Sequence, residues 1–203
     1  MITIVDYGMG NVGSVLNMFK KVGAEAKISS DLNEISKAPK ILLPGVGAFD
    51  TAMQRINDAG MLAVLNQKAL VEKVPVLGIC LGMQLLTNSS EEGKLPGLGW
   101  IDGAAHSFKG NTDESLRIPH MGWNVASIEQ QNAITAGYSG EIRFYFVHSY
   151  YVKVTNRKNC MMQTTYGLSF DSGIVRDNIF GAQFHPEKSH KFGMKFFENF
   201  AKI

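Results

Sequence analysis

The sequence has little of what marks a secreted or membrane-spanning protein. It contains only two cysteines, Cys80 and Cys160, which do not make the disulfide framework of a small extracellular domain, so a reducing compartment is the simpler expectation. The apolar stretch Ile2–Val5 is too short for a signal peptide, and no apolar run approaches the length of a membrane span. We therefore expect a soluble protein of the cytoplasm.

The sequence also lacks an excess of charge of either sign. Its 20 basic and 18 acidic residues are well mixed and leave a net charge of +2, without the basic tail or stripe that suggests binding to nucleic acid or to a membrane. No internal repeat or low-complexity linker is present. With 203 residues, 45% of them hydrophobic, the chain can bury a good core, and we expect a single domain over residues 1–203.

The most informative stretch is Val76–Leu86, an apolar run that contains a cysteine flanked by glycines. The pattern predicts a strand, a sharp turn and a helix, with Gly78-Ile79-Cys80-Leu81-Gly82 at the spacing of a nucleophile elbow. Cys80 would stand in the open at the first turn of the helix, where the helix dipole favours the thiolate. The N–H of Leu81 would be an oxyanion donor, and Gln84, four residues after Cys80, would lie on the same helical face.

A second stretch, Phe180–Glu187, ends a strand-like run with a histidine and a carboxylate two residues apart. In an extended chain the side chains of His185 and Glu187 point the same way, and Pro186 stiffens the link between them. A lone cysteine at a strand end is usually a small hydrophobic residue, and a lone His-Pro-Glu is a modest signal. Together they predict a thiol nucleophile with His185 as base and Glu187 as the group that orients the imidazole.

The rest of the chain predicts an α/β fold with a mostly parallel central sheet, helices on both faces and a small antiparallel region. The turn Gly45-Val46-Gly47 follows one predicted strand, so its N–H groups would supply a second oxyanion donor if that strand neighbours the one before Cys80. Strands are expected at 2–5, 25–29, 40–43, 76–79, 99–108, 125–128, 143–152 and 159–165, and helices at 11–22, 50–58, 61–73 and 190–200.

A different function is suggested by Gly8-Met9-Gly10-Asn11-Val12-Gly13, which matches the G-x-G-x-x-G pattern of dinucleotide-binding domains. It lies between a predicted strand and a predicted helix, and Asp31 stands about where a ribose-binding acid is expected. Against this alternative, Asp6 and Tyr7 separate the strand from the first glycine, and Met9 is bulky. A dinucleotide-binding domain therefore remains the alternative from another class.

Three further features have both a structural and a functional interpretation. Met121 and Trp123 lie in a predicted loop, Ile118–Asn124, which is either a local plug over the core or a surface for a partner, with the plug favoured. His148 ends a strand rich in aromatic residues and is either a catalytic base or a structural histidine. Cys160 has no adjacent base, so we interpret it as a packing residue.

With both parts of the site in view, the sequence resembles the triad (class I) glutamine amidotransferases, and within them the glutaminase subunits of imidazole glycerol phosphate synthase. The likeness extends nearly from end to end and is carried by six motifs in the same order, at residues 6–11, 43–49, 78–86, 119–124, 145–150 and 183–189. The resemblance implies the flavodoxin-like form of the α/β fold, glutamine hydrolysis, and no metal or organic cofactor.

The resemblance also implies roles for individual residues. The catalytic triad would be Cys80, His185 and Glu187, and the oxyanion hole would be formed by the N–H groups of Leu81 and of Val46 or Gly47. Glutamine would bind near Gly47, Gln84, His148, Ser149 and Tyr150. The interface with a partner would include Asn11, Met121, Trp123, Tyr145 and Lys188, which shifts the interpretation of the Met-Trp loop toward a partner surface.

The implied partner is a cyclase (β/α)8 barrel that forms a heterodimer with the glutaminase and receives its ammonia, in histidine biosynthesis. Close paralogues instead supply ammonia to a sugar amidotransferase synthetase of surface-polysaccharide synthesis. The stretch Gly103–Phe108 lacks a basic residue before its phenylalanine, and Ser189–Gly193 is somewhat similar to the paralogues. Both ammonia acceptors therefore stay open at the level of the sequence, with histidine synthesis favoured.

Overall fold

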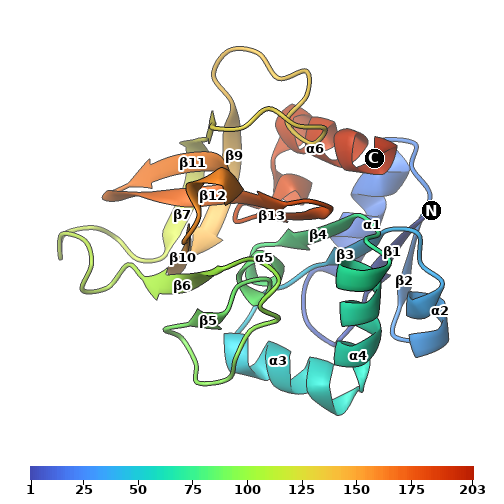
Figure 1. The fold of residues 1–203 in the computed structure, drawn as a ribbon. Coiled ribbons are helices and arrows are strands. Elements are labelled where there is room, and N and C mark those ends of the chain that lie inside the picture. Colours follow the sequence, from blue (N-terminus) through green and yellow to red (C-terminus); the bar gives the residue numbers. More distant parts are fainter.

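The computed structural model describes residues 1–203, and its centre is an eight-stranded mixed sheet with the order β2-β1-β3-β4-β13-β12-β11-β8 (Figure 1). Five strands are parallel: β2 (Ala26–Ser29), β1 (Ile2–Val5), β3 (Ile41–Leu43), β4 (Val76–Ile79) and β13 (Ile179–Ala182). The sheet continues antiparallel with β12 (Leu168–Arg176), β11 (Cys160–Tyr166) and β8 (Ser127–Ile128). The predicted α/β fold with a mostly parallel sheet is confirmed.

Helices cover both faces of the sheet, as the continuous apolar strands predict. Along β3, Leu42 packs into the core on one face, whereas Ile41 and Leu43 pack into the core on the other. The first core is covered by α1 (Val12–Lys21) and α6 (His190–Lys202). The second is covered by α2 (Leu32–Ser36), α3 (Phe49–Asp58), α4 (Met61–Asn66) and α5 (Leu81–Leu85).

Some predicted elements have different bounds. The helix expected at 61–73 divides into α4 and a π-helical turn at Gln67–Val71. The strand expected at 143–152 breaks at Ser149 into β9 (Arg143–His148) and β10 (Tyr150–Val154), which belong to different sheets. A single aromatic run gave no sign of this break, because both halves are suited to a strand. Helix α2 and strand β12 were not predicted.

The prediction of a loop at Ile118–Asn124 is wrong from His120 onward. This segment is β7 (His120–Val125), which pairs antiparallel with β9, so that His120 lies opposite His148 and Trp123 lies opposite Tyr145. The glycine and proline favoured a loop locally, but the ladder to β9 pairs the backbone in tertiary structure.

A third sheet contains β10, β6 (Gly103–Ser107) and β5 (Ser89–Ser90). One-turn 3-10 helices lie at Arg157–Asn159 and Pro186–Lys188.

This topology brings the segments that follow four parallel strands to one edge of the sheet. The chain leaves β1 toward Tyr7, β3 toward Pro44, β4 toward Cys80 and β13 toward Gln183. None of the helices combines the length and the hydropathy needed to cross a membrane.

Candidate active site

Cys80 occupies the sharp turn between β4 and α5, as predicted from its glycine neighbours. Its backbone has φ +53° and ψ −109°, a conformation that non-glycine residues rarely adopt. A Cβ added to Gly82 would lie 1.9 Å from the carbonyl oxygen of Leu43, and one added to Gly78 would lie 2.5 Å from the carbonyl oxygen of Gly82. The two glycines are therefore required because α5 starts directly against neighbouring backbone.

His185 and Glu187 reach the same place through the pairing of β4 with β13. These strands are parallel neighbours with Ile79 opposite Ala182, and the N–H of Cys80 donates to the carbonyl of Ala182 at 2.7 Å. The Nδ1 atom of His185 lies 2.8 Å from Oε1 of Glu187, and both side chains are buried. Sheet pairing thus places two segments about a hundred residues apart side by side.

The electrostatics of His185 suit a group that takes up a proton. Burial of the ring opposes the charged imidazolium, but the adjacent Cys80 thiol and the Glu187 carboxylate outweigh it and raise the pKa of His185 to about 10. Its Nε2 atom has no hydrogen-bond partner in the protein, so the proton that this nitrogen carries near neutral pH is available to a substrate. Cys80 and Glu187 therefore act on the imidazole in the same direction.

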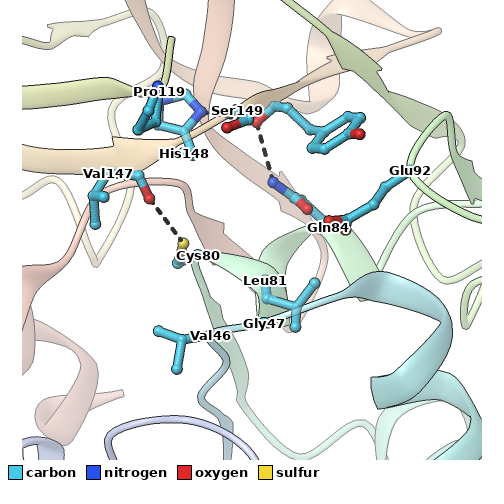
Figure 2. Close-up of a pocket in the computed structure, with 11 residues that line it drawn as sticks. Val46, Gly47, Cys80, Leu81, Gln84, Glu92, Pro119, Val147, His148 and Ser149 are labelled. Carbon is cyan, nitrogen blue, oxygen red and sulfur yellow. Dashed lines mark hydrogen bonds between the residues drawn. The ribbon is translucent and has the colours of Figure 1, made fainter.

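A cavity of about 350 Å³ opens beside Cys80 (Figure 2). Figure 2 shows Val46, Gly47 and Leu81 on one side of the sulfur and Pro119, Val147 and His148 on the other. Cys80 itself is only 6% exposed, so the expectation that it stands in the open is wrong: it is nearly buried and lines the cavity. The lining residues are Val46, Gly47, Cys80, Leu81, Gln84, Glu92, Pro119, Val147, His148, Ser149 and Tyr150.

Every residue expected to bind glutamine or to form the oxyanion hole lines this cavity. Gly47 has φ +115°, and a Cβ there would lie 2.5 Å from the Met9 methyl group, so the turn after β3 needs glycine at this point. Gln84 donates through Nε2 to the Tyr150 carbonyl at 3.1 Å and to Oε1 of Gln183 at 3.2 Å. The Leu81 N–H belongs to the first turn of α5, directly beyond the sulfur.

Three lining residues were not found from the sequence, namely Glu92, Pro119 and Val147. Glu92 lies in the polar segment 88–97, where an acid is indistinguishable from solvent-exposed neighbours. In the structure its Oε2 atom accepts a hydrogen bond from the Phe49 N–H at 2.9 Å, which holds the carboxylate at the cavity. The start of α3 therefore brings this loop to the site.

His148 lines the cavity, but its ring nitrogens are both engaged in hydrogen bonds. Nδ1 lies 2.8 Å from the Tyr150 carbonyl and Nε2 lies 2.9 Å from Nδ1 of His120. Burial lowers the pKa of His148 to about 3, so the ring is neutral near neutral pH. These contacts support the structural interpretation of His148 over a role as catalytic base.

Three of the residues expected at a partner interface, Met121, Trp123 and Tyr145, lie on the paired strands β7 and β9. Met121 is 61% exposed and Trp123 46% exposed, so the plug interpretation is wrong. The Trp123 ring lies 6.3 Å from that of Tyr145, and Nζ of Lys188 lies 5.8 Å from the Tyr145 ring centroid. Asn11 is exposed directly before α1, in the segment that follows β1.

Two other predictions concern residues away from the cavity. Cys160 is 3% exposed in β11, its thiol contacts the Met162 carbonyl at 3.6 Å, and burial raises its pKa to about 12, so its role in packing is confirmed. Asp31 caps α2, where its Oδ1 atom accepts from the N–H groups of Asn33 at 2.8 Å and Glu34 at 3.0 Å. The acid of the dinucleotide-binding alternative thus has a structural role.

Comparisons with known proteins agree with this geometry. The family model described as glutamine amidotransferase class-I matches residues 3–203. The chain is 54% identical over 202 residues to imidazole glycerol phosphate synthase subunit HisH 2 of Methanococcus maripaludis, covering 100% of this chain and 99% of that protein. It is 48% identical to the subunit HisH 2 of Pseudomonas aeruginosa, with both chains covered completely.

Solved structures support the fold. A crystal structure of a glutamine amidotransferase matches with a TM-score of 0.76 at 14% identity, covering 100% of this chain and 99% of that one. The structure of PurLQS from Thermotoga maritima matches with a TM-score of 0.75 at 18% identity, covering 99% and 97%. The chain therefore belongs to the class I glutamine amidotransferases, among the HisH subunits of imidazole glycerol phosphate synthase.

Proposed function

We propose that this chain hydrolyses the side-chain amide of glutamine to glutamate and ammonia, and that it passes the ammonia to a cyclase subunit for imidazole glycerol phosphate synthesis. The observation that carries the proposal is the position of Cys80, at a strained elbow between a cavity and the buried His185–Glu187 pair. The HisH relatives, which match over the full chain, support the same reaction.

In the proposed reaction Nε2 of His185 already holds the proton of Cys80, and the sulfur attacks the amide carbon of glutamine. The N–H of Leu81 and that of Val46 or Gly47 stabilise the oxyanion. His185 then protonates the departing nitrogen, ammonia leaves, and a thioester remains. The same histidine deprotonates a water molecule that hydrolyses the thioester to glutamate. Glu187 holds the imidazole by the 2.8 Å contact to Nδ1 and stabilises its charged form.

The lining of the cavity suits glutamine as the substrate. A free amino acid carries an ammonium and a carboxylate, and the Glu92 carboxylate is the one acidic group at the wall. We assign Glu92 to the substrate ammonium, with the Gln84 side chain beside it. The segment His148–Tyr150 forms the opposite wall. The volume of about 350 Å³ lies within the range of small-molecule sites.

We assign the exposed Met121, Trp123 and Lys188 and the half-buried Tyr145, together with Asn11, to the partner interface. Single exposed apolar residues are common, but two large ones with an aromatic and a cationic neighbour are typical of the centre of an interface. The chemistry of ammonia explains why a partner should cover the site. Ammonia becomes ammonium near neutral pH and is then no longer a nucleophile, so direct transfer preserves its reactivity.

The test of this function is glutamate release by the purified chain with and without a purified cyclase subunit. We expect release to depend on the cyclase and to couple to formation of imidazole glycerol phosphate. The alternative polysaccharide role would be supported if glutamate release did not couple to imidazole glycerol phosphate formation but did couple to the reaction of a sugar amidotransferase. Absence of glutamate release with either partner would overturn the proposal.

A further inference from the structure

A chain of buried hydrogen bonds connects β7 with the cavity. His120 and His148 are directly opposite each other on β7 and β9, and Nδ1 of His120 lies 2.9 Å from Nε2 of His148. At one end, Nδ2 of Asn124 lies 3.1 Å from Nε2 of His120. At the other end, Nδ1 of His148 lies 2.8 Å from the Tyr150 carbonyl. The chain therefore runs from Asn124 to a residue of the cavity wall.

Only one arrangement of protons satisfies all of these contacts. The Tyr150 carbonyl can only accept, so Nδ1 of His148 carries the proton and, in the neutral ring, Nε2 accepts. Nδ1 of His120 must then donate to it, which leaves Nε2 of His120 to accept from the Asn124 amide. That amide is itself fixed, because its Nδ2 also donates to the Thr165 carbonyl at 2.9 Å and its Oδ1 accepts from the Val125 N–H at 2.8 Å.

The surroundings of His120 keep this arrangement in place. The His120 ring is stacked at 4.7 Å on Phe146 and at 4.0 Å on Tyr166, and it is 2% exposed. Burial lowers the pKa of His120 to about 4, which keeps its ring neutral and its Nε2 atom an acceptor near neutral pH. Because no solvent reaches the buried His120 ring, its other tautomer would place one buried N–H donor against another donor, which costs free energy.

The last acceptor of the chain is shared with the substrate pocket. The Tyr150 carbonyl accepts from Nδ1 of His148 and from Nε2 of Gln84. Because Nε2 of Gln84 also donates to Gln183, both polar contacts of this side chain use its nitrogen. The Oε1 atom is left for a ligand in the cavity, and the Tyr150 carbonyl sets the direction in which it points.

We propose that His120 is a positioning residue for glutamine binding: its Nδ1–H donates to Nε2 of His148, which holds the His148 ring in place and thereby positions the Tyr150 carbonyl and Gln84 to bind the substrate. This rests on the proposed glutaminase function. His120 does not touch the cavity, so it acts through His148. It also shares β7 with Met121 and Trp123, whose side chains lie on the exposed side of the strand, so partner docking and glutamine binding depend on one strand.

The experiment compares three variants of the chain in complex with its cyclase. His120→Phe keeps an aromatic ring between Phe146 and Tyr166 but removes the donor to His148. His120→Asn loses the ring but keeps an N–H donor close to the position of Nδ1. Thr164→Val, which removes the buried Thr164–Ser172 hydrogen bond on β11, is the matched control for loss of a buried polar contact elsewhere.

The kinetic readout separates binding from chemistry. We expect His120→Phe to raise KM for glutamine by about tenfold, the equivalent of one hydrogen bond of about 1.4 kcal/mol, with little change in kcat. His120→Asn should restore KM most of the way, and Thr164→Val should leave it at the wild-type value. An unchanged KM in a folded His120→Phe variant, or an equal rise in Thr164→Val, would overturn the proposal.

A second readout does not depend on activity. In ¹⁵N NMR spectra of the chain, Nε2 of His148 should have the chemical shift of a nitrogen that accepts a hydrogen bond in the wild type and in His120→Asn, and that of a nitrogen without a donor in His120→Phe. The same Nε2 chemical shift in all three proteins would refute the positioning role. If the wild-type complex releases no glutamate while the NMR result holds, the proposed function fails and the hydrogen-bond chain stands as a structural element alone.

Discussion

The two cysteines of this protein show how the surroundings of a thiol decide its chemistry. Cys80 and Cys160 are both nearly buried, at 6% and 3% exposure, and a carboxylate lies near each of them. At Cys160 burial raises the pKa of the thiol to about 12, and the nearby acid, Asp171, adds to this rise. At Cys80 an imidazole stands between the thiol and the acid, so the negative charge of Glu187 stabilises a cation next to the sulfur.

The two sites also differ in their backbone. Cys80 sits at a strand end with φ +53°, at the border of a cavity, whereas Cys160 begins a strand within the sheet and faces the carbonyl of Met162. A thiol can act as a nucleophile where a base and a cavity for the substrate lie beside it. It remains a packing group where both are absent. Burial by itself does not distinguish the two cases.

The largest difference is expected on removal of each thiol. Cys80→Ala should reduce glutamate release by about 10⁶-fold, the scale seen when a nucleophile of a triad is removed. Cys160→Ala should keep activity close to the wild type and lose only a little stability, because it empties a small volume in the sheet. The measurement is glutamate release in the cyclase complex, and cyclase binding by Cys80→Ala is its control. Equal losses in both variants would end the distinction.

The next largest difference is expected on neutralising each acid. Glu187→Gln should reduce kcat by about 10³- to 10⁴-fold, because the neutral amide no longer stabilises the charged imidazole. Asp171→Asn should leave kcat unchanged but lower the free energy of unfolding, since Asp171 accepts from the Val154 N–H and pairs with Arg157 at 2.8 Å. Steady-state kinetics and denaturant unfolding of both variants measure the two effects. A large loss of kcat in Asp171→Asn would contradict the comparison.

A third difference concerns the glycines beside each cysteine. Gly82→Ala should lower the free energy of unfolding by about 3 kcal/mol, because its Cβ would lie 1.9 Å from the Leu43 carbonyl oxygen and backbone cannot move aside easily. Gly173→Ala, next to β11, should cost less, since its Cβ would meet the side chains of Met161 and Met162, which can adjust. Denaturant unfolding of both variants decides the order, and a greater loss in Gly173→Ala would reverse it.

The smallest effect is a dependence of stability on pH that belongs to the Cys80 site. His185 has its pKa raised from 6.5 to about 10, so its contribution is fully present below pH 6.5 and is lost as the pH rises toward 10. The free energy of unfolding should therefore decrease as the pH rises across this window, as measured by denaturant unfolding at several pH values. Glu187→Gln should flatten the fall, whereas Asp171→Asn should not. Equal slopes in wild type and Glu187→Gln would contradict the assigned cause.

Much of the parallel half of the molecule follows from the sequence, and less of the antiparallel half does. The strands at 2–5, 41–43 and 76–79 are short apolar runs between glycine or proline turns, so their type is encoded locally. In contrast, β7 contains Gly122 at φ +127°, and β9 and β10 share one aromatic run. Their identity depends on which strand each one pairs with, which no short window contains.

The same division applies to the candidate site. The glycines around Cys80 and the spacing of His185 and Glu187 predict a nucleophile and its base, because those side chains need particular local geometry. The sequence did not predict that Glu92 reaches the cavity or that Cys80 is nearly buried, and it placed Met121 and Trp123 at a partner surface only through the family resemblance. Each of these depends on contacts between segments that are far apart along the chain.

By itself, the sequence determined the elbow at Cys80 and the linked His185–Glu187 pair, since both are set by sterics over a few bonds. Only the tertiary structure decided that β13 lies beside β4, so that imidazole and thiol meet, and that His120 lies opposite His148. The physical reason is that pairing of distant strands is chosen by the packing of the whole core on both faces of the sheet, while the shape of a turn is chosen by its own residues.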